Sequence, residues 1–493
     1  MSQFTQLLGV RLGLEELADD LDPDAVPESG LDTEITESFI AADTAETAVT
    51  DTEAGIAKLE DTTASLERIA LALESMNGSP ISPEALVFLN IGMENAMQPF
   101  RPAADHSGGS NSSSSDSKEA KKGIIAKLIE AWDAFVLMIK KLWDHISGFF
   151  QRLFSTAGGM RKKAAAVLAR ARSVKDTAVG KKFEMNVNEI QCDGKVPTPD
   201  VFVTKLAELA KAAEDGLIGQ FSLAGHGFIE ELIAKVKTIG VAPPDDATFD
   251  SHGDKAAYFF GQKDVMNLKE TMVNGSIKVA YGLGITADAN PTIAKEAGDA
   301  SYIKMSKSPF IGDRVFVFTC IKDVKPLNGA KHSDFVQWCR SIRFTVKDNG
   351  TARLERAEVE TLSVDQLATV CGDVMNTCDA VLKFKDIWFK ELKQVMAYNE
   401  AFREQLRKIT SIYLTDAEKQ KMNNQGGKLS FMDILGLDYL QALKAINAGV
   451  TQTISGFGRF ENELCKQAMR NSHAAIIYAE RSLTEHTTPA KAA

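Results

Sequence analysis

The sequence GIIAKLIEAWDAFVLMIKKLWDHISGFFQRLF, residues 123–154, carries the strongest pattern in the chain. Large apolar side chains recur there every three or four residues, while lysines and acidic residues fill much of the other face. This period predicts an amphipathic α-helix of about eight turns, with too many charges to span a bilayer. Because its polar face mixes both charge signs, we favour a helix that packs against the core or a partner over one that lies on a membrane surface. The residues that mark the packing face are Trp132, Phe135, Ile139, Trp143 and Phe149.

A basic, alanine-rich segment, MRKKAAAVLARARSVK, follows at residues 160–175. Gly158 and Gly159 are expected to interrupt the helix before it, since glycine is a poor helix former. The two helices form one region, residues 119–178. Clustered positive charge can contact phosphate groups, although a solvated helix face is the simpler interpretation.

The period of the pattern changes in the region 179–358, which we interpret as α+β with a small mixed β part. The sequence Thr198-Pro199-Asp200 is a helix start signal, and the helix is expected at 198–214. Residues 348–350, Asp-Asn-Gly, are expected to form a hairpin turn. Strands are expected at residues 182–191, 276–283, 313–321, 340–348 and 351–362.

The region 359–484 returns to helical spacing, with an apolar stripe that begins at Leu367. We expect Gly449 to separate the last two helices and residues 485–493 to form a disordered tail. Together with the preceding regions, this predicts an α+β fold that is predominantly helical. The expected helices lie near residues 364–393, 395–413, 416–422, 429–446 and 453–482.

The N-terminal part of the chain has a different composition. Residues 1–74 contain 18 acidic and three basic residues, a net charge of −15, whereas the remainder contains 49 acidic and 53 basic residues, a net charge of +4. We call residues 1–74 the acidic arm, and we expect it to be partly helical and partly disordered, because like charges repel and stay solvated. Ser82 and Pro83 begin a short helix within residues 75–100, and a Ser/Gly linker follows at 101–118.

The sequence shows no constellation typical of catalysis, of a cofactor site or of a metal site. Its seven histidines are dispersed, its six cysteines form no CxxC pair, and GxSxG and phosphate-loop motifs are absent. Scattered cysteines are typical of reduced thiols inside a cell, and no signal peptide or long apolar run is recognised. We therefore interpret the chain as a non-catalytic structural protein. A deep pocket with converging polar groups within 180–350 would instead indicate an enzyme.

Several segments, in their order along the chain, resemble the internal head (inner-body, or prohead-core) proteins of giant tailed bacteriophages. The resemblance begins with the acidic arm itself, rests on the character and order of the segments, and covers most of the chain. It implies a virion structural protein inside the capsid, with other head proteins and itself as partners and with DNA in non-specific proximity. The segments are SLERIALALESM, SPEALVFLNIGMENAM, the 123–154 helix, KKFEMNVNEIQCDGKVPTP, SPFIGDRVF and ETLSVDQLATVCGDVMNTCDAVLKFKDIW.

The same resemblance implies a propeptide, which a head-maturation protease removes after a glutamate that has a small residue two positions earlier. Ala72-Leu73-Glu74 fits this pattern and gives Ser75 as the new N-terminus, while Glu67 and Glu94 fit as alternative sites. Removal of the acidic arm leaves a body with a net charge of +4, which favours approach to DNA phosphates. The alternative interpretation is a membrane-associated or ejected phage protein that acts through the 123–154 helix.

Overall fold

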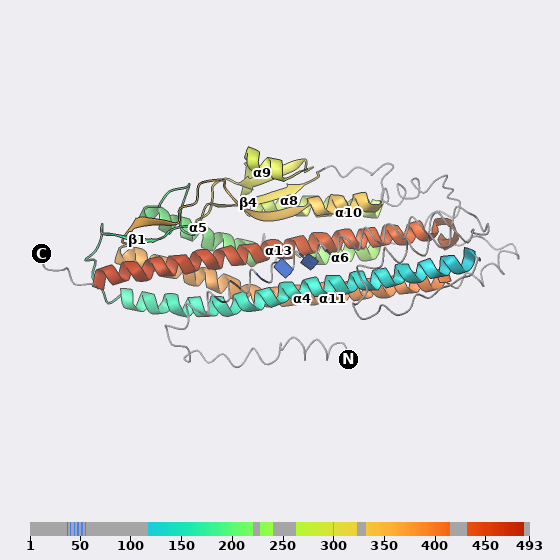
Figure 1. The fold of residues 1–493 in the computed structure, drawn as a ribbon, viewed down its shortest axis with the longest axis horizontal. Coiled ribbons are helices and arrows are strands. Elements are labelled where there is room, and N and C mark those ends of the chain that lie inside the picture. The colour runs from blue at the N-terminus through green and yellow to red at the C-terminus, as the bar shows by residue number, and fades with distance from the viewer. Residues whose placement is uncertain are drawn as a thin grey trace.

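Three long helices lie side by side along the long axis of the molecule (Figure 1). They are α4 (Ser117–Ala171), α11 (Val364–Leu414) and α13 (Phe431–Thr487). The computed structural model describes residues 117–219, 227–239, 263–298, 300–322, 332–414 and 431–487, with isolated positions between 37 and 55. The expected helix at 416–422 lies outside the described residues.

The long helices are continuous where the sequence predicted breaks. Helix α4 runs through Gly158 and Gly159, α13 runs through Gly449, and α11 joins the helices expected at 364–393 and 395–413, so all three predicted interruptions are wrong. Residues 485–487, expected in the tail, belong to α13. A glycine inside a helix costs about 1 kcal/mol, which the packing of a long buried helix readily offsets.

Aromatic side chains fill the contact between α4 and α11. Phe150 is fully buried, and its ring centroid lies 4.4 Å from that of Trp388 and 5.4 Å from that of Phe384. Leu153, one turn along α4, is buried as well. These residues belong to one hydrophobic core that extends along all three helices.

Shorter helices pack beside the long ones. Helix α5 (Pro199–Leu217) has Pro199 in its first turn, confirms the helix predicted there, and packs on α11. Helices α6 (Phe228–Thr238), α8 (Lys263–Gly282) and α10 (His332–Ser341) complete this layer. The strand predicted at 276–283 is wrong, because these residues continue α8 and its buried stripe.

Two antiparallel sheets cover part of the bundle. The larger has the order β2-β3-β4-β5, and the smaller pairs β1 with β6. A hairpin at 348–350 is therefore wrong, since β5 pairs with β4 while β6 pairs with β1. Helix α9 (Pro291–Glu296) packs through Ile293 on the larger sheet. The strands are β1 (Lys182–Asn186), β2 (Ile285–Asp288), β3 (Tyr302–Ser306), β4 (Arg314–Cys320), β5 (Arg343–Asp348) and β6 (Arg356–Glu360).

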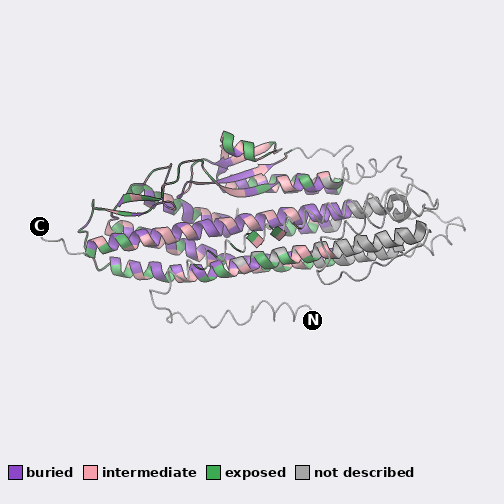
Figure 2. Ribbon diagram, in the orientation of Figure 1, coloured by how far each residue is buried: buried purple, intermediate pink, exposed green. Residues whose placement is uncertain are grey.

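Helix α13 lies at the centre of this arrangement and is buried along most of its described length (Figure 2). Its C-terminal end is fixed by His486, whose Nδ1 accepts hydrogen bonds of 3.1 Å from the backbone N–H groups of Thr177 and Ala178. The ring's Nε2 lies 2.8 Å from the carbonyl oxygen of Leu362 and donates to it. The predominantly helical α+β fold is confirmed.

Candidate functional site

The residues predicted for processing lie outside the described part of the chain. These are Ala72, Glu74 and Ser75, with the alternatives Glu67 and Glu94. Within the acidic arm, the described positions between 37 and 55 are helical, and each is exposed or half-buried. Gly55 lies beside the side chain of Met138 on α4.

The predicted packing helix corresponds to the N-terminal two thirds of α4. Its five marker residues are helical, but the side chains of Trp132, Phe135, Ile139, Trp143 and Phe149 lie outside the described set. Where α4 is described, its packing face is buried against α11 from Phe150 onward. From Phe150 onward, α4 therefore packs into the chain's own core.

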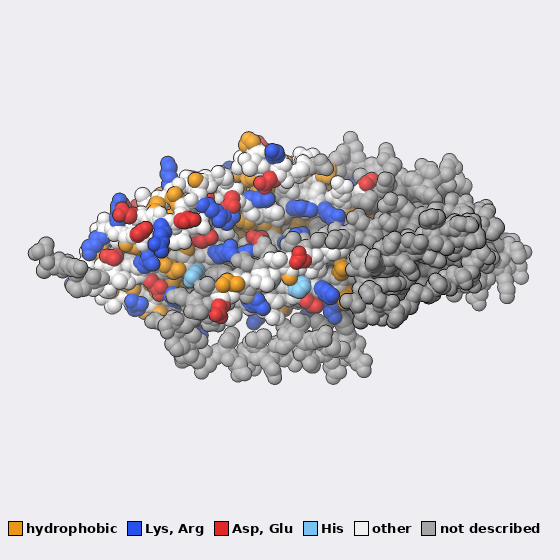
Figure 3. Space-filling model, viewed as in Figure 1, with side chains coloured by type: hydrophobic (Ala, Val, Ile, Leu, Met, Phe, Trp, Pro, Cys, Tyr) orange, Lys and Arg blue, Asp and Glu red, His pale blue; other side chains and the backbone are white. Residues whose placement is uncertain are grey.

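The basic segment that follows also contributes to the bundle. The Arg161 Nε lies 2.6 Å from Asp379 Oδ1 on α11. The Lys163 side chain is almost completely buried, and its Nζ lies 3.1 Å from Glu480 Oε2 on α13. On the face shown in Figure 3, basic and acidic side chains are interspersed over the described surface.

The described residues offer little that is typical of catalysis. All six cysteines are buried and free, and burial raises the pKa of each thiol, to about 12 for Cys192. Thiols of this kind stay protonated and unreactive at neutral pH. Within the described residues, no three or more histidine, cysteine, aspartate or glutamate side chains are grouped so that they could hold a metal ion. No described helix is apolar enough over its length to cross a membrane.

A buried carboxylate joins three segments that are distant in sequence. Asp313 is 3% exposed, and its Oδ2 accepts hydrogen bonds from Gln191 Nε2 at 2.7 Å, the Gly194 N–H at 2.7 Å and the Thr351 hydroxyl at 2.8 Å. Its Oδ1 accepts from the N–H of Asp193. Asp193 and Gly194 both have positive φ, as the tight Asp-Gly turn requires. Asp313 therefore stabilises this turn through charge-assisted hydrogen bonds.

The same junction is attached to helix α13. The Asn471 Nδ2 donates to the carbonyl oxygens of Glu189, at 2.6 Å, and Ile311, at 3.1 Å. Gly312 has a φ of +78°, and a Cβ there would lie 3.0 Å from that nitrogen. Two of the segments that carry the family resemblance, 181–199 and 308–316, thus meet at this point.

Two acidic side chains are buried within the bundle itself. Glu461 of α13 is 1% exposed and Glu391 of α11 is 7% exposed, and each has an oxygen without a hydrogen-bond partner among the described residues. Burial, followed by the charge of Glu230, raises the pKa of Glu391 to about 8. Burial and then the charge of Glu391 raise the pKa of Glu461. Burial therefore favours the protonated form of both carboxyl groups in the folded protein.

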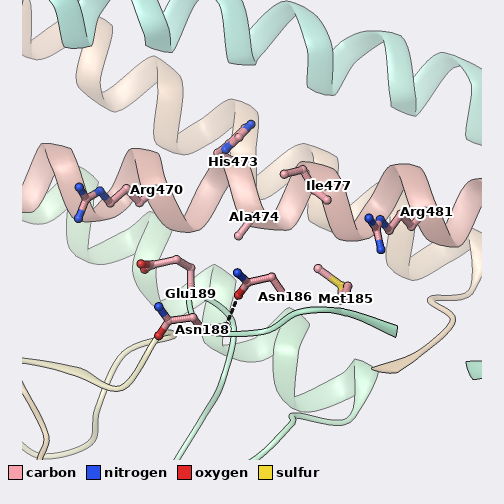
Figure 4. A pocket seen from close by; sticks show the side chains of 9 residues that line it. All are labelled: Met185, Asn186, Asn188, Glu189, Arg470, His473, Ala474, Ile477 and Arg481. Atoms are coloured by element: carbon pink, nitrogen blue, oxygen red, sulfur yellow. Dashed lines mark hydrogen bonds between the residues drawn. The ribbon is translucent and has the colours of Figure 1, made fainter. Parts of the chain in front are cut away.

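A pocket of about 430 Å³ opens between α13 and the segment that contains β1. Figure 4 shows that one stripe of α13 forms one side, while the end of β1 and the turn after it form the other. None of these lining residues is a serine, threonine, cysteine or lysine, and Glu189 and His473 are its titratable side chains besides the two arginines. Its lining residues are Met185, Asn186, Asn188, Glu189, Arg470, His473, Ala474, Ile477 and Arg481.

Sequence reasoning missed both the Asp313 junction and this pocket. The Asp-Gly turn at 193–194 is readable as a local signal, but its acceptor lies 120 residues away from Asp193. The pocket depends on the placement of β1 beside α13, almost 300 residues later. No local pattern indicates such a pairing.

Comparison with known proteins gives one family. Residues 41–430 match the phiKZ-like phage internal head proteins. No curated protein and no solved structure matches the chain. The match covers well over half of the 493 residues and begins within the acidic arm. The chain therefore belongs to the phiKZ-like phage internal head proteins, which are found inside the phage capsid.

Proposed function

We propose that the chain is a non-catalytic structural protein of the prohead core, and that it matures by losing its acidic arm after Glu74. Its partners are other head proteins and further copies of itself, and a head-maturation protease makes the cut. The observation that carries this proposal is the family match, because internal head proteins associate with other components of the head.

The described core supports the removal of the arm. Every buried side chain in the described part of the chain lies between Ser147 and His486. The described positions of the arm are exposed or half-buried, so a cut at Glu74 removes none of the described core. The cut therefore leaves every described buried side chain within the remaining body.

The charge distribution gives the removal a physical consequence. The arm carries a net charge of −15 and the remaining chain +4, so the cut reverses the sign of the net charge. Before the cut, the arm repels DNA and leaves the chain available for assembly with other proteins. After the cut, the body tolerates the phosphate-rich interior of a filled head.

Phage that encode Glu74→Gln test the position of the cut. The expected result is that mature particles retain the longer chain, or carry one cut at Glu67 or Glu94, because the glutamate before the scissile bond is gone. Glu60→Gln is the matched control, since it removes the same charge from the same arm but has no small residue two positions earlier. Unchanged processing of the Glu74→Gln chain would contradict a cut at this site.

A further inference from the structure

The pairing of β1 with β6 determines which backbone groups of β1 point away from its partner. The Val187 N–H donates to the carbonyl oxygen of Glu355, and the Thr361 N–H donates to that of Lys181. Both bonds fit the register in which Glu184 lies opposite Glu358. In an antiparallel pair the bonded residues alternate, so odd-numbered residues of β1 bond to β6 and even-numbered residues point outward.

Helix α13 crosses this small sheet and contacts both of its outer edges. The Tyr478 hydroxyl donates to the carbonyl oxygen of Glu360 at the outer edge of β6. The Arg481 Nη1 donates, at 2.8 Å, to the carbonyl oxygen of Glu184 at the outer edge of β1. Among the described residues, the N–H of Glu184 and both backbone groups of Asn186 have no partner. Unpaired groups of this kind at a sheet edge are a template for another strand.

The pocket lies between β1 and α13 (Figure 4), and Asn186, whose backbone groups point outward, is one of its lining residues. Ala474 and Ile477 of α13, together with Met185, give it an apolar wall beside the open backbone groups. Glu189, the one acidic residue of the lining, has its carboxylate 3.3 Å from Gln467 Nε2. The pocket therefore combines a hydrogen-bonding edge with an apolar wall, as sites for added strands do.

Two arginines lie at the ends of the pocket. Arg470 and Arg481 are separated by eleven positions on α13, a distance of about 16 Å along the helix axis at 1.5 Å per residue. An extended peptide covers this distance with about five residues. A single anion is too small to reach both, so a ligand that contacts both arginines is elongated and carries negative charge near each end. An acidic peptide provides both the charge and the backbone groups that pair with β1, whereas a nucleic acid strand provides only the charge.

We propose that the outer edge of β1 receives an extended, acidic segment of another phage head protein as a third antiparallel or parallel strand. In this chain's own acidic arm, Gly55 lies beside Met138 of α4, and we assign the partner segment to a different protein. The inference deepens the proposed role in head assembly by naming the chemistry of a partner. It does not depend on where the arm is cut.

A photo-crosslinking residue at Asn188, in the pocket, tests this in phage particles. The expected product joins this chain to an acidic segment of a second head protein, identified by mass spectrometry of the crosslinked peptides. Glu184→Pro removes an outward N–H of β1 without removing a bond to β6, and the crosslink yield is expected to fall at least tenfold. Glu358→Pro is the matched control, because it removes the same side chain and an outward N–H from the opposite edge.

Equal yields for the two proline variants would overturn the proposal. A crosslink to DNA, to residues 1–74 of this chain, or to no protein would overturn it as well. If Glu184→Pro fails to fold by circular dichroism, Arg470→Glu replaces it, and the same tenfold loss is expected. The N-terminus of the chain is read from the same particles, so a failure of the proposed processing is distinguished from a failure of the strand site.

Discussion

At Asp313, one side chain holds the Asp-Gly turn, the Thr351 hydroxyl and the Gln191 amide together. The residue has a φ of +55°, a conformation that asparagine also tolerates. Asp313→Asn therefore tests the carboxylate without adding backbone strain. It places an NH₂ group against donors that need acceptors, and buried unpaired donors are costly.

We expect Asp313→Asn to lower the free energy of unfolding by about 2–4 kcal/mol, measured by urea denaturation. The control is Asp348→Asn, which changes an exposed carboxylate that forms ion pairs with Arg314 and Arg353. Exposed pairs contribute about 0–1 kcal/mol, so this change is expected to be small. Similar losses in the two variants would contradict a structural role for Asp313.

The buried glutamates make stability depend on pH. In the folded protein the pKa of Glu391 is raised from 4.5 to about 8, with burial as the main cause, the charge of Glu230 raising it and that of Lys390 lowering it. Because the folded state then binds the proton more tightly than the unfolded state, the contribution of Glu391 to stability is greatest below pH 4.5 and is lost as the pH rises toward 8.

Glu391→Gln removes this titration and is expected to flatten the pH dependence. At pH 8 the variant should be more stable than the original protein by about 1–3 kcal/mol, and near pH 5 the two should be similar. The measurement is urea denaturation at both values of pH, with the exposed Glu358→Gln as the control. A variant that is equally destabilised at both values would show that Glu391 contributes packing rather than a buried proton.

At the scale of the elements, the space around two helical glycines shows where a neighbouring helix packs closely and where it does not. A Cβ on Gly449 of α13 would lie 2.6 Å from Cys339 Sγ and 2.8 Å from a ring carbon of Phe335, both on α10. A Cβ on Gly158 of α4 would meet nothing within 4 Å. The first glycine allows α10 to approach α13, while the second is tolerated without a packing reason.

Gly449→Ala is expected to destabilise the protein by about 1–3 kcal/mol, because overpacking outweighs the better helix propensity of alanine. Gly158→Ala should stabilise it by about 0.5–1 kcal/mol, because there the propensity acts alone. Thermal denaturation of both variants gives the comparison. A shift of the same sign in both would contradict the close contact between α10 and α13.

The helices and strands also show which parts of the fold can be predicted from local sequence. Strands β4 and β5 and helix α5 have strong local signals, and the predictions for them are confirmed. The residues 276–283 contain a short run typical of a strand, but the apolar spacing from Val265 onward is helical and prevails over that run. Gly350 has the positive φ of a turn, at +80°, yet the strands beside it pair with β4 and β1. Strand partners are chosen by contacts across the whole fold, which a local pattern does not contain.

At the scale of the whole molecule, the two parts of the chain carry opposite net charge, −15 in residues 1–74 and +4 in the remainder. Residues 75–493 are therefore expected to elute from heparin at a higher salt concentration than the full chain, because polyanions no longer meet the acidic arm. A chain that lacks the linker 101–118, whose charges cancel, is the control and should elute with the full chain. Equal elution of the full and shortened chains would remove the electrostatic role of the arm.

The most direct test of the account is the N-terminal sequence and intact mass of this protein recovered from mature phage particles. The account predicts a chain that begins at Ser75, which places it in a head-maturation pathway and accounts for an arm outside the described core. A chain that begins at Met1 or Ser2 would contradict the account, because the arm would then be a permanent part of the protein in the filled head.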